Sequence, residues 1–226
     1  KAKDPRKDQS YFLYSMKKET LPKVLFPLGG LTKQEVRDLA RKYGLNTADK
    51  PESQDICFVP DGGYQKFLEN RLGKEIFSPG PYKDETGKIV GEHKGIAYYT
   101  IGQRERLGIA LGKPVYVYKI EKETNTVYIG PETMLYSSGL LASNFNPVSI
   151  DRPTEKMEVN VRIRYNAPEV KGFLTALEDG RVRVDFHEPQ KSVTPGQSVV
   201  FYDGDVVLAG ATIEESIKYA SSHSLL

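Results

Sequence analysis

The sequence of 226 residues contains one cysteine, Cys57, and no tryptophan. One cysteine excludes a disulfide within the chain and a zinc site built from several thiolates, and it is typical of a reducing compartment. No apolar run reaches the length that crosses a membrane, and the charged start Lys1–Lys7 has no apolar signal core. The sequence therefore predicts a cytoplasmic protein with no membrane partner.

The sequence also has no large excess of positive or of negative charge. The 32 Lys and Arg residues nearly balance the 30 Asp and Glu residues, which leaves a net charge of +2. A nucleic acid would therefore have to bind a local basic patch. The apolar and charged fractions, 38% and 27%, are those of a globular protein with one large or two small domains. The chain does not begin with Met, and we expect a fragment of a longer protein.

Cys57 lies in a turn-prone segment, Lys50–Phe58, between two predicted helices. A single Cys between Ile56 and Phe58 is more often a small buried apolar residue than a reactive group. Its position in a polar loop between helices favours chemistry instead. Asp55 counts against activation, because a nearby negative charge raises the pKa of a thiol. The residues alone leave both interpretations open.

Two helices are predicted on either side of this loop. Thr32 and Glu35 form a capping box, apolar residues follow at helical spacing up to Tyr43, and Gly44 ends the pattern. A second amphipathic helix is predicted after Asp61-Gly62-Gly63. The predicted strand Val24–Leu28, or a buried link in its place, precedes the first helix.

From residue 76 onward the sequence predicts strands. Ser78-Pro79-Gly80-Pro81 is expected to form a turn. Four strands are expected in the central part: Ile89–Gly91, Ile96–Ile101, Val115–Ile120 and Thr126–Ile129. Six more are expected in the last third: 140–145, 157–164, 170–177, 181–186, 198–202 and 206–212. The turns Asp179-Gly180 and Asp203-Gly204 predict tight hairpins. We expect a β-rich α+β fold, with a small helical segment around the Cys57 loop, a small β-rich central domain and a C-terminal antiparallel β-barrel.

Two groups of basic residues are candidates for binding phosphate. Arg162, Arg164 and Tyr165 cluster before a turn, and an Arg beside a Tyr can pair with phosphate and stack on a base. A surface Arg with a half-buried Tyr fits the sequence equally well. The loop Gly102–Gly108 contains Arg104 and Arg106, and it can be a phosphate-binding loop or a solvated one.

Five stretches taken together resemble one family. They are Lys7–Leu13 (KDQSYFL), Ser53–Phe58 (SQDICF), Gly102–Arg104 (GQR), Arg162–Tyr165 (RIRY) and Val193–Ser198 (VTPGQS). The chain is similar, from Lys7 to about Glu214, to the C-terminal portion of the tRNA-specific 2-thiouridylases, enzymes that replace O2 of the wobble uridine of tRNA with sulfur.

The resemblance implies roles for particular residues. Cys57 matches the cysteine that carries a persulfide and delivers its sulfur to C2 of a uridine adenylated with ATP, and a thiolate is a strong nucleophile for such a step. Positions that match tRNA contacts of the family are Lys7, Asp8, Gln9, Arg164, Tyr165 and Gln197. The implied partners are tRNA and a sulfur-relay protein or cysteine desulfurase. The implied domains are a remnant of the nucleotide-binding domain at 1–21, a central domain at 22–136 and the barrel at 137–226.

The sequence also departs from the family pattern. It contains neither the Ser-Gly-Gly-x-Asp-Ser loop that binds ATP nor a second cysteine that would release the sulfur. We therefore expect the ATP site to be absent from this chain and no catalysis by these residues alone. We also expect no metal site and a monomer. The alternatives are an RNA-binding module in which Cys57 is inert, and a tRNA methyltransferase. The second is disfavoured, because no strand with a Gly-rich turn and an acidic residue is present to bind a methyl donor.

Overall fold

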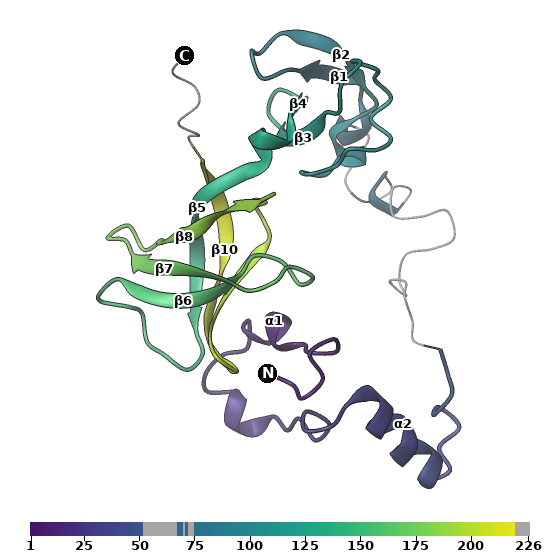
Figure 1. Cartoon of the computed structure of the whole chain (residues 1–226), viewed down its shortest axis with the longest axis vertical. Coiled ribbons are helices and arrows are strands. Elements are labelled where there is room, and N and C mark those ends of the chain that lie inside the picture. The colour runs from purple at the N-terminus through teal and green to yellow at the C-terminus, as the bar shows by residue number, and fades with distance from the viewer. Residues whose placement is uncertain (52–66, 70, 72–74, 220–226) are drawn as a thin grey trace. The chain divides into compact units, whose positions relative to one another are not determined.

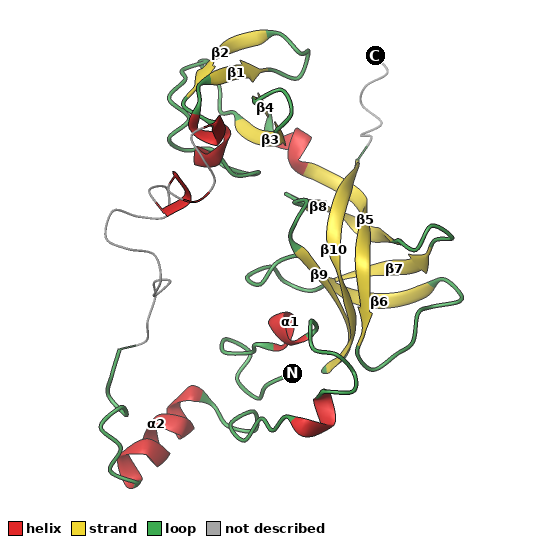
Figure 2. Cartoon of the chain, turned by 180° about the vertical axis from the view of Figure 1, so that it is seen from behind, coloured by secondary structure: helices red, strands yellow, loops and turns green. Residues whose placement is uncertain are grey.

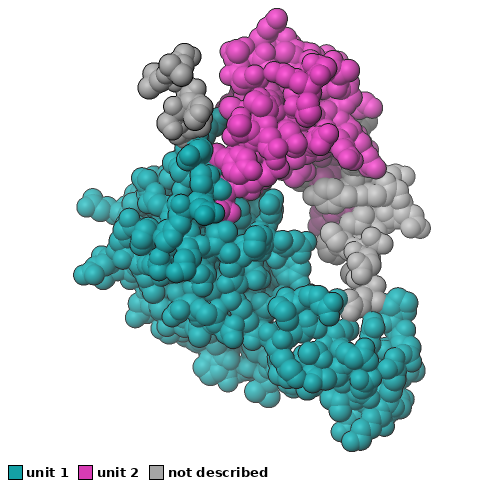
Figure 3. Space-filling model, viewed as in Figure 1, with its two compact units in different colours: residues 1–52, 137–189, 193–226 teal, residues 53–136, 190–192 magenta. Residues whose placement is uncertain are grey.

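The computed structural model describes residues 1–51, 67–69, 71 and 75–219 (Figure 1). The chain divides into two compact units (Figure 3). Unit 1 comprises residues 1–52, 137–189 and 193–226, and unit 2 comprises residues 53–136 and 190–192. Cys57 and most of the helix predicted after Gly63 lie outside the described residues.

Unit 1 contains a closed six-stranded barrel with the strand order β10-β5-β8-β7-β6-β9. Its strands are β5 (Tyr136–Pro147), β6 (Met157–Arg162), β7 (Val170–Ala176), β8 (Val182–Lys191), β9 (Ser198–Asp203) and β10 (Val206–Lys218). The strand pairs β6–β7, β7–β8, β9–β10, β6–β9 and β5–β10 are antiparallel. The predicted antiparallel barrel is therefore confirmed.

Alternation along the strands explains why this part of the chain closes into a barrel. In β6, Val159 and Val161 are buried while the alternate residues Glu158, Asn160 and Arg162 are more exposed, as the two-residue repeat of a strand requires. The Asp203-Gly204 hairpin joins β9 to β10, with Gly204 at φ +52°, a conformation that glycine adopts readily. The Asp179-Gly180 turn joins β7 to β8 in the same way.

The N-terminal segment of unit 1, residues 1–51, has little regular structure. It contains α1 (Ser10–Leu13), a 3₁₀ turn (Leu21–Lys23) and α2 (Lys33–Lys42). The predicted capping box of α2 is present: Glu35 N–H donates to Thr32 Oγ1, and Thr32 N–H donates to the Glu35 carboxylate. No residue of this fully described helix is buried.

The prediction of a buried link or strand at Val24–Leu28 is wrong. The segment is irregular, and Leu25 is 86% exposed. Pro27 has no N–H to donate to a strand ladder, and among the described residues no strand lies beside the segment to pair with it. The residues from Leu25 to Leu28 instead line an open groove of about 620 Å³, together with Leu13, Leu31 and Val36.

Unit 2 is built on a four-stranded sheet with the order β2-β1-β4-β3. Its strands are β1 (Gly80–Lys83), β2 (Ile89–His93), β3 (Tyr116–Glu121) and β4 (Thr126–Gly130), with short 3₁₀ turns at Glu75–Phe77, Ile96–Tyr98 and Glu132–Leu135. Strands β1 and β4 run parallel, and the other pairs are antiparallel. Buried residues of the strands form its core, led by Tyr82, Val117 and Val127.

Two predictions in unit 2 are wrong. Ile96–Ile101 is not a strand, since Ile96–Tyr98 form a 3₁₀ turn that follows Gly95 at φ +130°. The backbone at Gly95 passes so close to that of Phe77 that a side chain there would collide with it. The chain therefore turns after this glycine, although the aromatic and β-branched residues that follow favour a strand. Gly80-Pro81, predicted as part of a turn, begins β1. Pro81 is tolerated early in this short strand, as proline is at the first residues of strands.

Within the described ranges, the structure contains no helix that is both long and apolar enough to cross a membrane.

Candidate nucleic-acid interface

The N-terminal segment lies on the barrel beside β9 and β10 (Figures 1 and 2). Tyr11 is buried, and its hydroxyl donates to the backbone oxygen of Ser198 at 2.8 Å. Burial raises the pKa of Tyr11 to about 12, which keeps this hydroxyl protonated as a donor. The ring of Tyr14 lies directly on Gly210, where a Cβ would overlap it. Two tyrosines and one glycine therefore fix α1 on the barrel.

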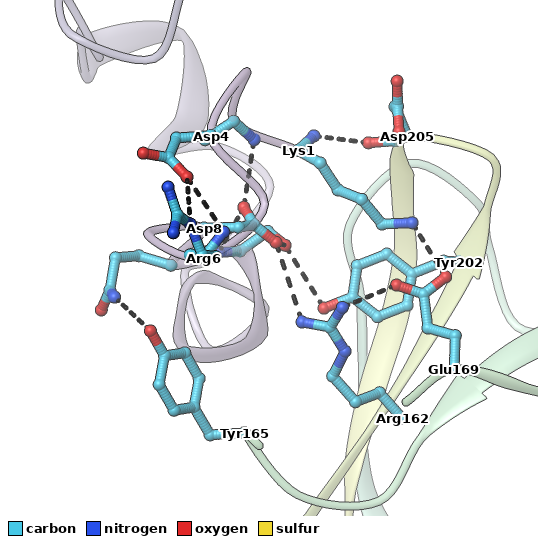
Figure 4. A network of polar contacts seen from close by, with 12 residues as sticks. Lys1, Asp4, Arg6, Asp8, Arg162, Tyr165, Glu169, Tyr202 and Asp205 are labelled. Atoms are coloured by element: carbon cyan, nitrogen blue, oxygen red, sulfur yellow. Dashed lines mark hydrogen bonds and ion pairs between the residues drawn. The ribbon is translucent and has the colours of Figure 1, made fainter. Parts of the chain in front are cut away.

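Asp8 is the buried centre of the polar contacts behind this surface (Figure 4). Its carboxylate accepts hydrogen bonds from the Ser10 hydroxyl at 2.6 Å, the Ser10 N–H at 3.2 Å and the Ala2 N–H at 3.1 Å. Burial raises the pKa of Asp8, but these donors outweigh burial and hold the pKa below its ordinary value of 3.8. Asp8 is therefore an ionised carboxylate that orders the turn leading into α1.

Arg162, the last residue of β6, connects this turn to the barrel. Its Nη2 donates to Glu169 Oε1 at 2.8 Å, and its Nη1 lies 3.8 Å from Asp8 Oδ2. The guanidinium also lies over the ring of Tyr202, 5.4 Å from its centroid. Its side chain is only 16% exposed. Arg162 therefore links Asp8 of the N-terminal segment to Glu169 of the barrel and offers little surface to a ligand.

Gln9 and Tyr165 meet at the exposed edge of the same region. Gln9 Nε2 donates to Tyr165 Oη at 2.8 Å, although the two residues are 156 positions apart in the sequence. The ring of Phe12 lies against that of Tyr165, with centroids 4.9 Å apart and planes at 32°. Phe12 is 52% exposed, and Tyr165 is partly exposed. The result is an aromatic pair open to solvent beside an amide, a combination on which a base can stack.

The remaining predicted tRNA contacts lie on or near this region of unit 1. Arg164, next to Tyr165, is exposed, and so is Lys7. Gln197 is exposed in the turn after Thr194, and its backbone oxygen accepts the Ile213 N–H at 2.8 Å. The residue after it, Ser198, is the one that Tyr11 contacts. We name the exposed side chains of Lys7, Gln9, Phe12, Arg164, Tyr165 and Gln197 the arm–barrel surface.

Asp4 extends the ordered contacts to α2. Its carboxylate accepts the N–H of Lys33 at the start of α2 and the N–H of Arg6, both at 3.1 Å. The Lys33 N–H is the largest cause that lowers the pKa of Asp4. A carboxylate at a helix N-terminus also interacts favourably with the helix dipole.

Two residues have roles that sequence reasoning missed. Phe12 directly follows Tyr11, and nothing in the sequence tells which of the two rings is buried. The sequence grouped Arg162 with Arg164 and Tyr165 as a candidate for phosphate, whereas the structure encloses it among carboxylates. Ile163 is buried in the barrel core, so alternation places both arginines on the outer side of the barrel. No local signal therefore separates Arg162 from Arg164.

Among the described residues, no group of three or more His, Cys, Asp or Glu side chains is placed to hold a metal ion. Cys57, the predicted sulfur carrier, lies outside the described ranges.

Comparisons with known proteins cover almost the whole chain. Three family models match: the tRNA methyl transferase HUP domain at residues 1–61, the tRNA methyl transferase PRC-barrel domain at 65–131 and the aminomethyltransferase β-barrel domain at 137–213. The chain is 51% identical to the tRNA-specific 2-thiouridylase MnmA of Carboxydothermus hydrogenoformans over 95% of its length. It is 52% identical to the proteins of that name from Halothermothrix orenii and Acetivibrio thermocellus, over 96% and 92% of its length.

The chain belongs to the tRNA-specific 2-thiouridylase family. It spans 58%, 60% and 58% of the lengths of these three relatives, respectively. The resemblance drawn from the five sequence motifs is thereby confirmed.

Proposed function

We propose that this chain is the sulfur-carrying and tRNA-binding portion of a tRNA 2-thiouridylase. The observation that carries the tRNA-binding part is the contact between Gln9 and Tyr165, 156 residues apart, at the edge of the arm–barrel surface. Folding brings the motifs Lys7–Leu13 and Arg162–Tyr165 into direct contact. The Arg164 guanidinium, the Gln9 amide and the rings of Phe12 and Tyr165 are thereby open to solvent in one region. Arginine pairs with phosphate and aromatic rings stack on bases, which are the two interactions that hold an unpaired RNA segment.

In this proposal Asp8 positions the surface and does not touch RNA. Its carboxylate is buried and already accepts three hydrogen bonds, and an ionised carboxylate repels phosphate. Lys7, Gln9, Arg164, Tyr165 and Gln197 are the proposed contacts. Phe12 joins them because its ring lies on that of Tyr165.

The proposed reaction follows from the resemblance of the segment around Cys57. A persulfide on Cys57 attacks C2 of a uridine whose O2 carries an adenylate, the C–S bond forms, and AMP leaves with the oxygen. The sulfur–sulfur bond must then be broken by a thiol, which leaves a disulfide on the protein. The chain has one cysteine, so this second thiol comes from outside these 226 residues.

ATP activates the uridine in the proposed reaction, and the loop motif that would bind it is not in this sequence. We therefore expect the chain alone to bind tRNA and to accept sulfur without thiolating the uridine. The proposed sulfur source is a cysteine desulfurase or its relay protein, and the proposed setting is the cytoplasm, with the chain as a monomer.

The tRNA-binding part is tested by the salt dependence of tRNA affinity. Arg164→Ala should weaken binding and reduce the slope of log K against log salt by about one, because one phosphate contact is lost. Arg183→Ala is the matched control, since Arg183 is an exposed arginine of β8 that pairs with Asp185. A slope for Arg164→Ala equal to that of wild type removes Arg164 from the contact surface.

The sulfur-carrying part is tested by intact mass after incubation with a cysteine desulfurase and its relay protein. We expect a species heavier by one sulfur atom that reductant removes and that Cys57→Ser does not form. If tRNA binds and Cys57→Ser changes no activity, the chain is an RNA-binding module with an inert cysteine.

A methyl-transfer function is the second candidate, because two of the matching family models are described as tRNA methyl transferase domains. The three relatives named above, which are 51% or 52% identical to the chain over the matched residues, are named thiouridylases, which favours sulfur transfer. Nucleoside mass analysis of tRNA treated with a full-length relative of this family separates the two, since one reaction exchanges oxygen for sulfur and the other adds a methyl group.

A further inference from the structure

Unit 2 contains a loop whose residues the proposed reaction does not use. Residues 102–113, which we call the basic loop, connect the 3₁₀ turn at Ile96–Tyr98 to β3 without regular structure. Four of its backbone positions have positive φ: Gly102 at +91°, Arg106 at +60°, Gly108 at +71° and Gly112 at +69°. A non-glycine residue such as Arg106 rarely adopts this conformation. The chain therefore follows a path that few sequences allow.

Gln103 holds the first part of the basic loop in place. Its side-chain oxygen accepts the Thr100 N–H at 3.0 Å, and its amide donates to the backbone oxygen of Glu105 at 3.0 Å. Its backbone oxygen accepts the N–H of Val117 at 2.9 Å, at the start of β3. The glutamine thus fixes the backbone on both sides of Arg104 against the sheet.

Apolar contacts hold the second part. Leu107 is buried, and its backbone oxygen accepts the Tyr82 hydroxyl at 2.7 Å. Ile109 lies so close to Gly91 of β2 that a Cβ there would meet its side chain at 2.8 Å. The loop is therefore packed on the sheet of unit 2 before any ligand arrives, which lowers the entropy that binding has to overcome.

The cationic side chains of the basic loop are open to solvent. Arg104 and Arg106 are exposed, and within the described part of the chain neither has an ion-pair partner. Lys113 lies 3.6 Å from Glu85, with 61% of its side chain exposed. All three line an open depression of about 430 Å³. The loop contains three cationic side chains and one carboxylate, Glu105.

The backbone of the loop adds hydrogen-bond donors. No N–H group from residue 104 to residue 113 donates to another described residue. Backbone N–H groups that follow a left-handed residue can turn toward one anion, as they do in phosphate-binding nests. Arginine side chains and free N–H groups in one depression are the donors that a phosphate group takes.

We propose that the basic loop is a second tRNA-binding site, which holds the phosphate backbone of tRNA through Arg104 and Arg106. The loop contains no aromatic residue on which a base could stack. The arginine forks match phosphate in a bidentate geometry, so contact through the loop is independent of sequence. This inference rests on the proposed function, since tRNA is the ligand in both.

The test measures tRNA binding by the 226-residue chain over a range of salt concentrations. Arg104→Ala and Arg106→Ala should each weaken binding about fivefold at physiological salt, and the double variant on the order of twentyfold. The slope of log K against log salt should fall by about 1.5 in the double variant. Both side chains are exposed, and we expect the melting temperature to stay at the wild-type value.

Lys122→Ala is the matched control. Lys122 is an exposed cation of the same unit, in the turn after β3, and the six residues of that strand separate it from the basic loop by about 20 Å. We expect wild-type binding from this variant. An equal loss from Lys122→Ala and Arg104→Ala would mean a general charge effect and would overturn the assignment.

Gln103→Ala sharpens the result, because it leaves every charge in place and removes the two side-chain hydrogen bonds that fix Arg104. We expect weaker binding with a slope between those of wild type and Arg104→Ala. If wild type binds tRNA and both arginine variants bind with the wild-type affinity and slope, the basic loop is not a tRNA site. If wild type fails to bind even at low salt, the proposed function fails together with this inference.

Discussion

The barrel and the N-terminal segment belong to one compact unit, but they are ordered by different interactions. The barrel has a continuous apolar core, with buried side chains from all six strands. The N-terminal segment has no comparable core: α2 buries no residue, and α1 buries only Ser10 and Tyr11. Its order comes from the polar contacts centred on Asp8 and Arg162 (Figure 4), together with the packing of Tyr11 and Tyr14 on the barrel.

This difference has a consequence for binding. The barrel should keep its structure when single polar contacts are lost, whereas the N-terminal segment should not. The arm–barrel surface takes side chains from both, so it exists only while the segment is docked. Substitutions that release the segment should therefore reduce tRNA binding without unfolding the barrel.

The largest effect is expected from Arg162→Ala. Glu169 keeps its ion pair with Lys1 and Asp8 keeps its hydrogen bonds, but both lose the cation that lies between them in a largely buried site. Breaking a buried pair from one side costs about 3–5 kcal/mol. Urea unfolding measures the loss. Arg183→Ala, which breaks an exposed pair with Asp185, should cost about 0–1 kcal/mol. Equal losses from the two variants would contradict the special role of Arg162.

A smaller effect is expected from Gly210→Ala. The added Cβ would overlap the ring of Tyr14, and such overpacking costs about 1–3 kcal/mol. We expect faster proteolysis within residues 1–20, with the barrel still folded. Gly30→Ala is the control, since a Cβ there meets nothing within 4 Å. The double variant Gly210→Ala/Tyr14→Ala should lose less stability than the sum of the losses of the two single variants, because the ring that the new Cβ would overlap is gone. If the two single losses simply add, the overlap is not the cause.

The lowered pKa of Asp8 should make the docking of the N-terminal segment sensitive to acid. Its pKa is lowered in the folded protein, so its stabilisation is complete above the unfolded value of 3.8 and is lost as the pH falls through the lowered value. Asp8→Asn should be less stable than wild type at neutral pH and should lose less stability on acidification. Thermal unfolding between about pH 2.5 and pH 7 measures both. Parallel pH curves for the two proteins would contradict this assignment.

The smallest effect is expected from Thr32→Ala. Loss of the capping hydroxyl should destabilise α2 by about 1 kcal/mol. Because α2 buries no residue, the unfolding of the barrel should stay unchanged. Amide hydrogen exchange resolves the two regions: α2 should exchange faster while β6 and β9 keep their protection. Faster exchange in both regions would mean that α2 and the barrel unfold together.

The barrel could be predicted from the sequence because its signals are local. Alternation within β6, and the Asp203-Gly204 turn, lie within a few residues of the structure that they specify. The capping box of α2 was predicted for the same reason. Val24–Leu28 was predicted wrongly because an apolar run does not tell whether a partner is available to cover it.

The candidate site could be predicted only through the family resemblance. The contact between Gln9 and Tyr165 joins residues 156 positions apart, and no periodicity or spacing encodes it. Arg162 and Arg164 are the same residue type two positions apart. Arg162 is largely enclosed beside carboxylates and Arg164 is exposed, because the barrel wall and the docked segment decide what each side chain meets.

The central claim is that the arm–barrel surface binds tRNA, and the affinity of Tyr165→Ala for tRNA tests it most directly. Loss of one stacking ring costs about 1–3 kcal/mol per base, so we expect binding to weaken on the order of tenfold. Tyr219→Ala, at an exposed tyrosine just past β10, should bind as wild type does. Wild-type affinity for Tyr165→Ala at every salt concentration would contradict the account.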